Sequence, residues 1–117
     1  MLENMLEVAV KAADKKLAFD ISVLNLEGVS SLSDYFIIAS GNSDRQAMAI
    51  AEEIDDKMSE AGYECCGKEG QREGSWILLD YGDIVIHVFR KEAREFYGLD
   101  KLWENASKIE IEKYLEV

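Results

Sequence analysis

The stretch Gly74–Trp103, GSWILLDYGDIVIHVFRKEAREFYGLDKLW, is the part of this chain around which the rest is organised. It contains two runs typical of β-strands, Ser75–Asp80 and Asp83–Phe89, which are separated only by Tyr81 and Gly82. Such a short spacer ending in Gly predicts a tight hairpin, because Gly adopts a positive φ without steric cost. Tyr81 is less typical of the first turn position, so the turn type stays open.

Side-chain alternation gives the predicted hairpin two different faces. With the turn at these two residues, the expected cross-strand pairs are Trp76 with His87, Leu78 with Val85, and Asp80 with Asp83. One face is then purely aliphatic and is predicted to be core; it consists of Ile77, Leu79, Ile84, Ile86 and Val88. The other face combines a tryptophan and a histidine with two carboxylates, and this composition needs an explanation.

Size and charge restrict the possible partners. The chain has 117 residues, 48% hydrophobic and 32% charged, which is enough for one globular domain and too little for two. It carries 24 acidic against 13 basic residues, for a net charge of -11. Phosphate backbones are bound mostly by Lys and Arg, so we expect basic protein partners and no sequence-specific contact with nucleic acid.

Several classes of protein do not fit the sequence. No segment approaches the ~20 apolar residues that cross a membrane, and residues 1–16 lack the basic start of a signal peptide. We therefore expect a cytoplasmic protein without a membrane partner. Cys65 and Cys66 are adjacent, so in a strand they point to opposite faces and do not form an ordinary disulfide. The single histidine and the absence of a CxxC pair argue against a metal site.

Outside the hairpin, helical and strand-like segments alternate. The expected elements are a helix over residues 1–16, strands at Phe19–Leu26, Tyr35–Ser40 and Tyr63–Gly67, a helix from Ser43 to about Ala61, and a short helix ending near Gly98. Ser43 and Gln46 form a capping box, and the acidic side chains of that helix are interpreted as a solvated face. Strand, helix and strand in succession predict a right-handed parallel crossover.

These elements predict a single α/β domain in the order α-β-β-α-β-β-β-α, with a five-stranded mixed sheet flanked by helices. The domain is expected to cover residues 1–103, with Leu99, Leu102 and Trp103 forming a last turn under the sheet. Residues 104–117 are weakly patterned, and we expect this C-terminal tail to be partly disordered.

Four features were weighed as chemical sites. Gly41-Asn42-Ser43 before a helix has an anion-binding geometry, but simple capping is favoured because further glycines and a P-loop lysine are missing. Asp80 and Asp83 suggest a metal or acid–base pair, yet a hairpin tip projects into solvent. His87 is interpreted as a structural residue paired with Trp76. Trp76 itself fits either a protein-binding anchor or a core residue, and the pattern leaves both open.

Three segments resemble a known family: LSDYFIIASGNSDRQ (Leu32–Gln46), Glu69-Gly70, and the stretch Gly74–Trp103 with its W-x-L-x-D-Y-G-D-x-V-x-H-V-F string. They closely resemble the ribosomal silencing factor family, also called the Iojap family. The resemblance implies a domain with nucleotidyltransferase-like topology that has no catalytic motif, no enzymatic activity and no cofactor. No paired-acid D-x-D string follows Gly41, which agrees with that implication.

The resemblance further implies a translational repressor. Such proteins bind ribosomal protein L14 on the large subunit and sterically block joining of the small subunit. The contact residues implied for this chain are Trp76, Leu78, Asp80, Tyr81, Asp83 and His87, with Arg94 and Tyr97 on the following helix. Two alternatives stay open: a nucleotide-binding or nucleotidyl-transferring enzyme that uses the helix start at Ser43, and a homodimerisation module, since family members can dimerise.

Overall fold

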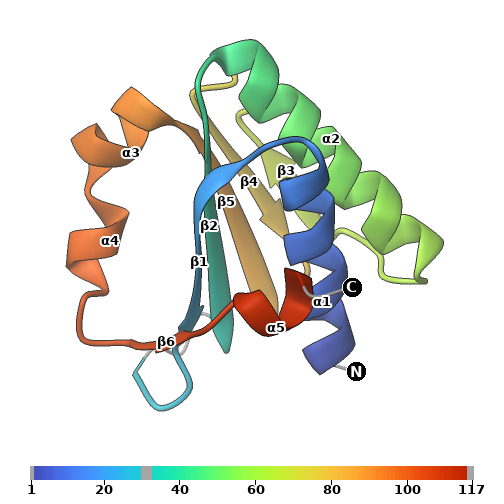
Figure 1. The fold of residues 1–117 in the computed structure, drawn as a ribbon, viewed down its shortest axis with the longest axis vertical. Coiled ribbons are helices and arrows are strands. Elements are labelled where there is room, and N and C mark those ends of the chain that lie inside the picture. The colour runs from blue at the N-terminus through green and yellow to red at the C-terminus, as the bar shows by residue number, and fades with distance from the viewer. Residues whose placement is uncertain (1, 30–32, 116–117) are drawn as a thin grey trace.

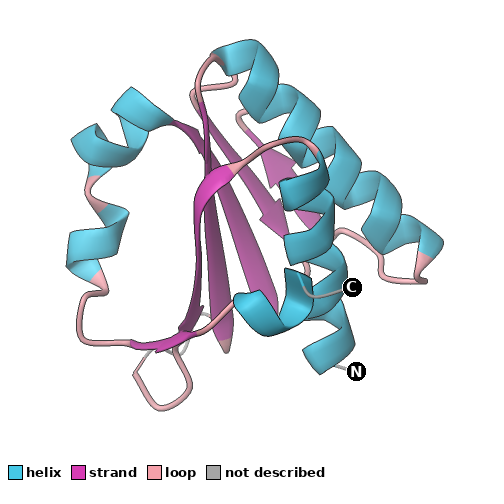
Figure 2. Cartoon of the chain, viewed as in Figure 1, coloured by secondary structure: helices cyan, strands magenta, loops and turns pink. Residues whose placement is uncertain are grey.

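The computed structural model describes residues 2–29 and 33–115. Its strands are β1 (Phe19–Asn25), β2 (Tyr35–Gly41), β3 (Gly67–Glu69), β4 (Trp76–Asp80), β5 (Ile84–Arg90) and β6 (Ser107–Ile109). Its helices are α1 (Leu2–Lys15), α2 (Asp44–Glu60), α3 (Lys91–Tyr97), α4 (Leu99–Leu102) and α5 (Glu112–Leu115). The strands form one sheet between two helical layers, with α1, α2 and α5 on one side and α3 and α4 on the other (Figures 1 and 2).

The sheet confirms the predicted single α/β domain with a mixed sheet, but it has six strands instead of five. The strand order is β3-β4-β5-β2-β1-β6. Among the described residues, β2 and β5 are the only neighbours that pair in parallel, and every other neighbouring pair is antiparallel. The first eight elements follow the predicted order, and the extra strand comes from the segment after Trp103.

The segment after Trp103, which the sequence predicted as a partly disordered tail, contains strand β6 and helix α5 within residues 104–115. Strand β6 pairs with β1, with Val23 opposite Ile109. Helix α5 lies beside α1 (Figure 1), and the buried Tyr114 donates a hydrogen bond of 2.8 Å to Glu3 Oε1. These short elements are held by partners far away in the sequence, so the local pattern could not reveal them. Glu116 and Val117 lie outside the described residues.

The hairpin has a different register from the predicted one. Trp76 pairs with Phe89, Leu78 with His87, and Asp80 with Val85. Tyr81 N donates to Ile84 O at 2.9 Å, so the turn residues are Gly82 and Asp83. Asp80 Oδ1 accepts a hydrogen bond from Gly82 N at 2.8 Å, and Gly82 has φ +85°, so the glycine sits one position earlier in the turn than predicted.

This shift moves every pair by two residues, which leaves each side chain on its predicted face. The aliphatic face is therefore confirmed as core, and all five of its members are at most 1% exposed: Ile77, Leu79, Ile84, Ile86 and Val88.

The third strand was also misplaced. It covers Gly67–Glu69, whereas Tyr63–Gly67 was predicted. Because β3 is antiparallel to β4, β4 is antiparallel to β5, and β5 is parallel to β2, strand β3 runs parallel to β2. The crossover through α2 is thus parallel as predicted, but it passes over two strands and ends at the sheet edge.

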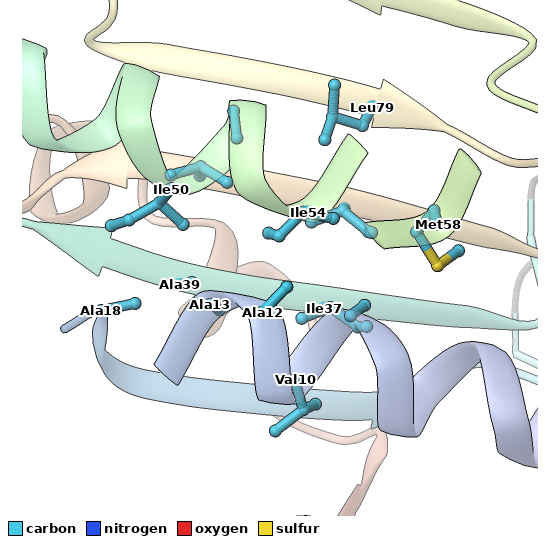
Figure 3. Close-up of a cluster of buried hydrophobic side chains, with 14 of the residues drawn as sticks. Val10, Ala12, Ala13, Ala18, Ile37, Ala39, Ile50, Ile54, Met58 and Leu79 are labelled. Carbon is cyan, nitrogen blue, oxygen red and sulfur yellow. The ribbon is translucent and has the colours of Figure 1, made fainter. Parts of the chain in front are cut away.

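Helix α2 and the core beneath it follow the predicted pattern. Ser43 Oγ accepts from Gln46 N at 3.1 Å, and Gln46 Oε1 accepts from Asn42 N at 2.6 Å, which closes the start of the helix. The side chains that α2 buries recur at helical spacing: Ala47, Ile50, Ala51, Ile54 and Met58. Figure 3 shows Ile50, Ile54 and Met58 on the side of α2 that points toward β2 and α1.

A second, smaller core lies on the opposite face of the sheet, beneath α3 and α4. Its buried side chains are Leu24, Leu26, Phe36, Ile38, Phe89, Ala93, Leu99 and Ala106. Leu99 and Trp103 pack there as predicted, but Leu102 is 70% exposed. Within the described residues, no helix is long and apolar enough to cross a membrane.

Candidate functional site

The face of β4 and β5 that looks away from α1 and α2 holds most of the predicted contact residues. We call it the aromatic face and define it by Trp76, Leu78 and Asp80 of β4 together with Tyr97 of α3. Trp76, Leu78 and Asp80 are half-buried, and Tyr97 is 51% exposed. Helices α3 and α4 thus cover only part of this side of the sheet, and a row of β4 side chains stays open to solvent.

Trp76 is held firmly although it is only half-buried. Its Nε1 donates to His87 Nδ1 at 3.1 Å. Its ring stacks on Phe89 with 5.0 Å between ring centroids and lies 4.6 Å from the Tyr97 ring. Trp76 therefore belongs partly to the core and partly to the surface, as an anchor residue of an interface does. The packing agrees with the interpretation as a core residue, and the interpretation as a protein-binding anchor stays a prediction.

His87 is a structural residue in this fold. It is 3% exposed and lies 4.5 Å from the Phe36 ring. Burial lowers its pKa to about 4, so the imidazole is neutral at pH 7. Since Nδ1 accepts the Trp76 hydrogen bond, the proton sits on Nε2, which has no hydrogen-bond partner within the described residues. Burial among the rings of Phe36, Trp76 and Phe89 leaves the His87 side chain little surface for the predicted direct contact with a partner.

Tyr81 also cannot contact a partner directly, because it is 6% exposed and lies on the opposite face. Tyr81 follows Ile77 and Leu79 in the side-chain alternation of β4, so it packs with them in the core on the α1 and α2 side of the sheet. Its hydroxyl donates to Asp55 Oδ1 at 2.8 Å, and Lys68 pairs with the other oxygen of Asp55. Burial raises the pKa of Tyr81 far above its ordinary value. The residue fastens the hairpin tip to α2.

The two tip carboxylates have different environments. Asp80 Oδ1 is occupied by the turn, whereas the Asp83 side chain is exposed. The backbone oxygen of Asp83 accepts hydrogen bonds from Ser33 Oγ at 2.9 Å and from Tyr35 N at 3.0 Å, which ties the tip to the start of β2. No three His, Cys, Asp or Glu side chains gather as metal ligands anywhere in residues 2–29 and 33–115.

Arg94 is engaged inside the protein instead of facing a partner. Its Nε and Nη2 bind the two oxygens of Asp100 at 2.9 Å each, and its Nη1 donates to Ser40 Oγ at 2.7 Å. Further bonds reach the backbone oxygen of Asp20 and Ser22 Oγ. Arg94 thus locks α3 and α4 onto β1 and β2. Its guanidinium holds the pKa of Asp100 below the usual range, and burial opposes that shift.

Sequence reasoning missed the residues that complete the aromatic face. A cleft of about 280 Å³ beside Trp76 is lined by Leu78, Tyr97 and Ser75 together with the carboxylates of Glu69 and Glu73. Phe96, beside Tyr97, is 82% exposed. The sequence carried no clear signal for either glutamate. Glu69 lies in β3, opposite Leu78, but that strand was predicted at Tyr63–Gly67, and Glu73 lies in a loop, where side chains do not alternate regularly.

The start of α2 does not offer a free anion site. Ser43 and Gln46 already bond the backbone there, as described above. Asp44 in the first turn pairs with Arg90 at 3.2 Å, so this nearby basic side chain is already engaged, and a carboxylate in the first turn opposes a bound anion. A Cβ on Gly41 would come within 3.1 Å of Ala47 N, so this glycine serves close packing of β2 against α2.

With this geometry in view, comparisons with known proteins agree with one another. The family model described as "Ribosomal silencing factor during starvation" matches residues 1–117. The ribosomal silencing factor RsfS of Bacillus subtilis is 47% identical over 104 residues, covering 89% of this chain and 88% of the relative. Two solved structures superpose on the fold. One from Chromobacterium violaceum has a TM-score of 0.86 and 34% identity over 89% of this chain and 87% of that chain. One from Bacillus halodurans has a TM-score of 0.82 and 41% identity over 92% and 98%.

The fold is a single α/β domain with a mixed sheet between helical layers, and the two solved structures share it. The chain belongs to the ribosomal silencing factor family.

Proposed function

We propose that this protein represses translation by binding ribosomal protein L14 on the large subunit through its aromatic face. Family membership supports a translational repressor that acts on the ribosome. The observation that carries the finer proposal is Trp76, which is fixed by His87 and Phe89 and yet stays partly accessible beside Tyr97. Rigid, half-buried tryptophans and tyrosines are typical anchors of protein interfaces.

Charge supports a basic protein as the partner. The net charge is -11, Asp80 lies on the same face of β4 as Trp76, and Asp83 is exposed at the hairpin tip. Opposite charges on two proteins accelerate their encounter and exclude wrong partners. The same net charge disfavours a contact made mainly with ribosomal RNA.

Repression then follows from steric exclusion of the small subunit by the bound domain, without a chemical step. The domain measures 32 × 32 × 28 Å, so when bound at the subunit interface it occupies space that the small subunit needs. We place this activity in the cytoplasm and assign the protein no enzymatic role and no cofactor. The internal capping of α2 argues against the alternative of a nucleotide site at Ser43.

Substitution of Trp76 tests the proposed interface. Trp76→Ala should weaken binding to purified L14 by about 2 kcal/mol, roughly thirtyfold, as loss of an interface anchor does. Isothermal titration calorimetry measures the affinity, and circular dichroism checks the fold.

Since Trp76 also packs in the smaller core, a surface variant is needed as well. Asp83→Lys should weaken binding most at low salt, whereas Asp56→Lys on α2 makes the same charge change away from the face. Wild-type affinity in folded Trp76→Ala and Asp83→Lys variants would remove this face from the mechanism.

A second proposal concerns the free protein, which we expect to pair with another copy through the exposed side chains of α3 and α4. Phe96 is 82% and Leu102 70% exposed, and large apolar side chains that gather on one surface favour association. Light scattering of the purified protein measures the mass directly. A monomer at all concentrations up to about 100 μM would contradict this pairing.

A further inference from the structure

We infer that the cleft beside Trp76 accepts an arginine side chain of the protein partner. This inference rests on the proposed function, since it names the chemistry of the contact made at the same face. The cleft has about 280 Å³ of space, and its lining combines two aromatic rings with two carboxylates. The residues concerned are Trp76, Tyr97, Glu69 and Glu73.

The backbone brings the two carboxylates to this cleft. Glu69 of β3 lies opposite Leu78 of β4, which puts both side chains on the aromatic face. The chain then turns sharply, with Gly74 N donating to Gly70 O at 3.0 Å. A Cβ on Gly70 would lie 1.9 Å from Trp76 O, so only glycine lets the turn pass this close to β4. Glu73 is thereby folded back over the edge of the cleft.

The charge of the cleft is unbalanced. Glu69 and Glu73 are both exposed, and neither forms an ion pair with a residue in the described part of the chain. No Lys or Arg is among the residues that line the cleft. Asp55 of α2, on the far side of the sheet, differs in this respect, since it is paired with Lys68. A positive group from outside would therefore meet two unpaired carboxylates.

The aromatic rings favour a flat cation over a compact one. The Trp76 N–H is already given to His87, so Trp76 offers a partner its ring and not its donor. Tyr97 lies 4.6 Å away with an interplanar angle of 48°, which makes a tilted aromatic wall. A planar guanidinium stacks on such rings and can bond a carboxylate through two parallel N–H groups. A lysine ammonium is a compact charge that is attracted to a ring face, but it neither stacks flat nor forms this paired bond.

Neutralising the two glutamates tests the inference. In Glu69→Gln/Glu73→Gln the shape of the cleft is kept and both charges are lost. We expect its affinity for purified L14 to fall about tenfold at low salt. The matched control is Glu52→Gln/Asp56→Asn, which removes the same two charges from the exposed side of α2 and should bind within about twofold of the wild type. Equal affinities of the two double variants would overturn the inference.

A small probe reads the cleft without the partner protein. N-acetyl-arginine amide and N-acetyl-citrulline amide differ only in the charge and the donors of the side-chain head. In a two-dimensional NMR titration, the arginine compound should shift the Trp76 indole N–H resonance at concentrations at least about fivefold lower than the citrulline compound. The Glu69→Gln/Glu73→Gln protein should lose this preference. Identical titrations of both compounds would overturn the inference.

The two experiments separate failure of the cleft from failure of the proposed function. If Trp76→Ala abolishes L14 binding while the glutamate variant binds normally, the aromatic face stands and the arginine contact is wrong. If L14 does not bind the wild type at all, the proposed partner is wrong, and the arginine and citrulline titrations alone decide for or against the cleft.

Discussion

The buried imidazole of His87 couples stability to pH. The unfolded chain binds a proton at this residue below a pH of about 6.5, whereas burial lowers the pKa in the folded protein to about 4. Between these values the unfolded state holds more protons, so stability falls as pH drops. We expect the wild type to lose about 2 kcal/mol between pH 7 and pH 5 relative to His87→Gln, which has no group that titrates there.

Urea unfolding at pH 7, 6 and 5 measures this difference. Comparison with His87→Gln removes the contribution of carboxylates common to both proteins, such as Asp100, whose pKa lies below the usual range. The glutamine also keeps an acceptor for the Trp76 N–H. Parallel stability curves for the two proteins would show that His87 is not buried as described.

The faces of single residues were predictable from the sequence, but their exposure was not. Parity alone put Ile77 and Leu79 on the core side, and it stayed correct although the register was wrong by two. The same parity put Tyr81 with them, which the sequence interpretation overlooked when it assigned the tip to a partner. His87 was placed on the right face, yet its burial depends on the rings of Phe36 and Trp76, which the local sequence pattern does not position.

At the scale of elements, long periodic segments were predicted well and short ones were missed. Helices α1 and α2 each bury a regular stripe, so their sequences are sufficient to define them. Strands β3 and β6 have three residues each and exist because an edge strand offers them free backbone groups. The partly open aromatic face was likewise not predictable from local pattern. It depends on the short lengths of α3 and α4 and on the contacts by which Arg94 holds them.

The Arg94 contact predicts how α3 and α4 stay attached. Arg94→Met removes the partner of Asp100, which is itself 40% exposed on its side chain, and leaves Ser40 without its donor. We expect a loss of about 2 kcal/mol in the free energy of unfolding, less than for a fully buried pair because water reaches Asp100. Lys91→Met on the same helix, where the side chain is exposed, should cost less than about 0.5 kcal/mol.

Hydrogen exchange locates the effect. Arg94→Met should speed exchange of backbone amides in residues 91–102 more than in α2, since the Arg94 contacts hold α3 and α4 and do not reach α2. Equal stability of Arg94→Met and Lys91→Met in urea unfolding would contradict this role of Arg94.

At the scale of the whole molecule, the proposed mechanism requires that binding and subunit joining exclude each other. A domain that only binds L14 would be found on joined ribosomes as well as on free large subunits. A domain of 32 × 32 × 28 Å that fills part of the subunit interface can occupy only the free large subunit. The distribution between the two particles therefore separates occlusion from simple binding.

Sucrose-gradient sedimentation measures this distribution. We expect the protein to migrate with free large subunits and to be absent from joined ribosomes. When it is added to large subunits before small subunits, at a concentration about tenfold above its dissociation constant, over 90% of the sites are filled and the joined-ribosome peak should shrink accordingly. The Trp76→Ala protein at the same concentration serves as the control, since its roughly thirtyfold weaker binding leaves most sites empty and the peak restored. Equal occupancy of joined ribosomes and free large subunits would sink the steric mechanism even if L14 binding were intact, because the bound domain would then leave room for the small subunit.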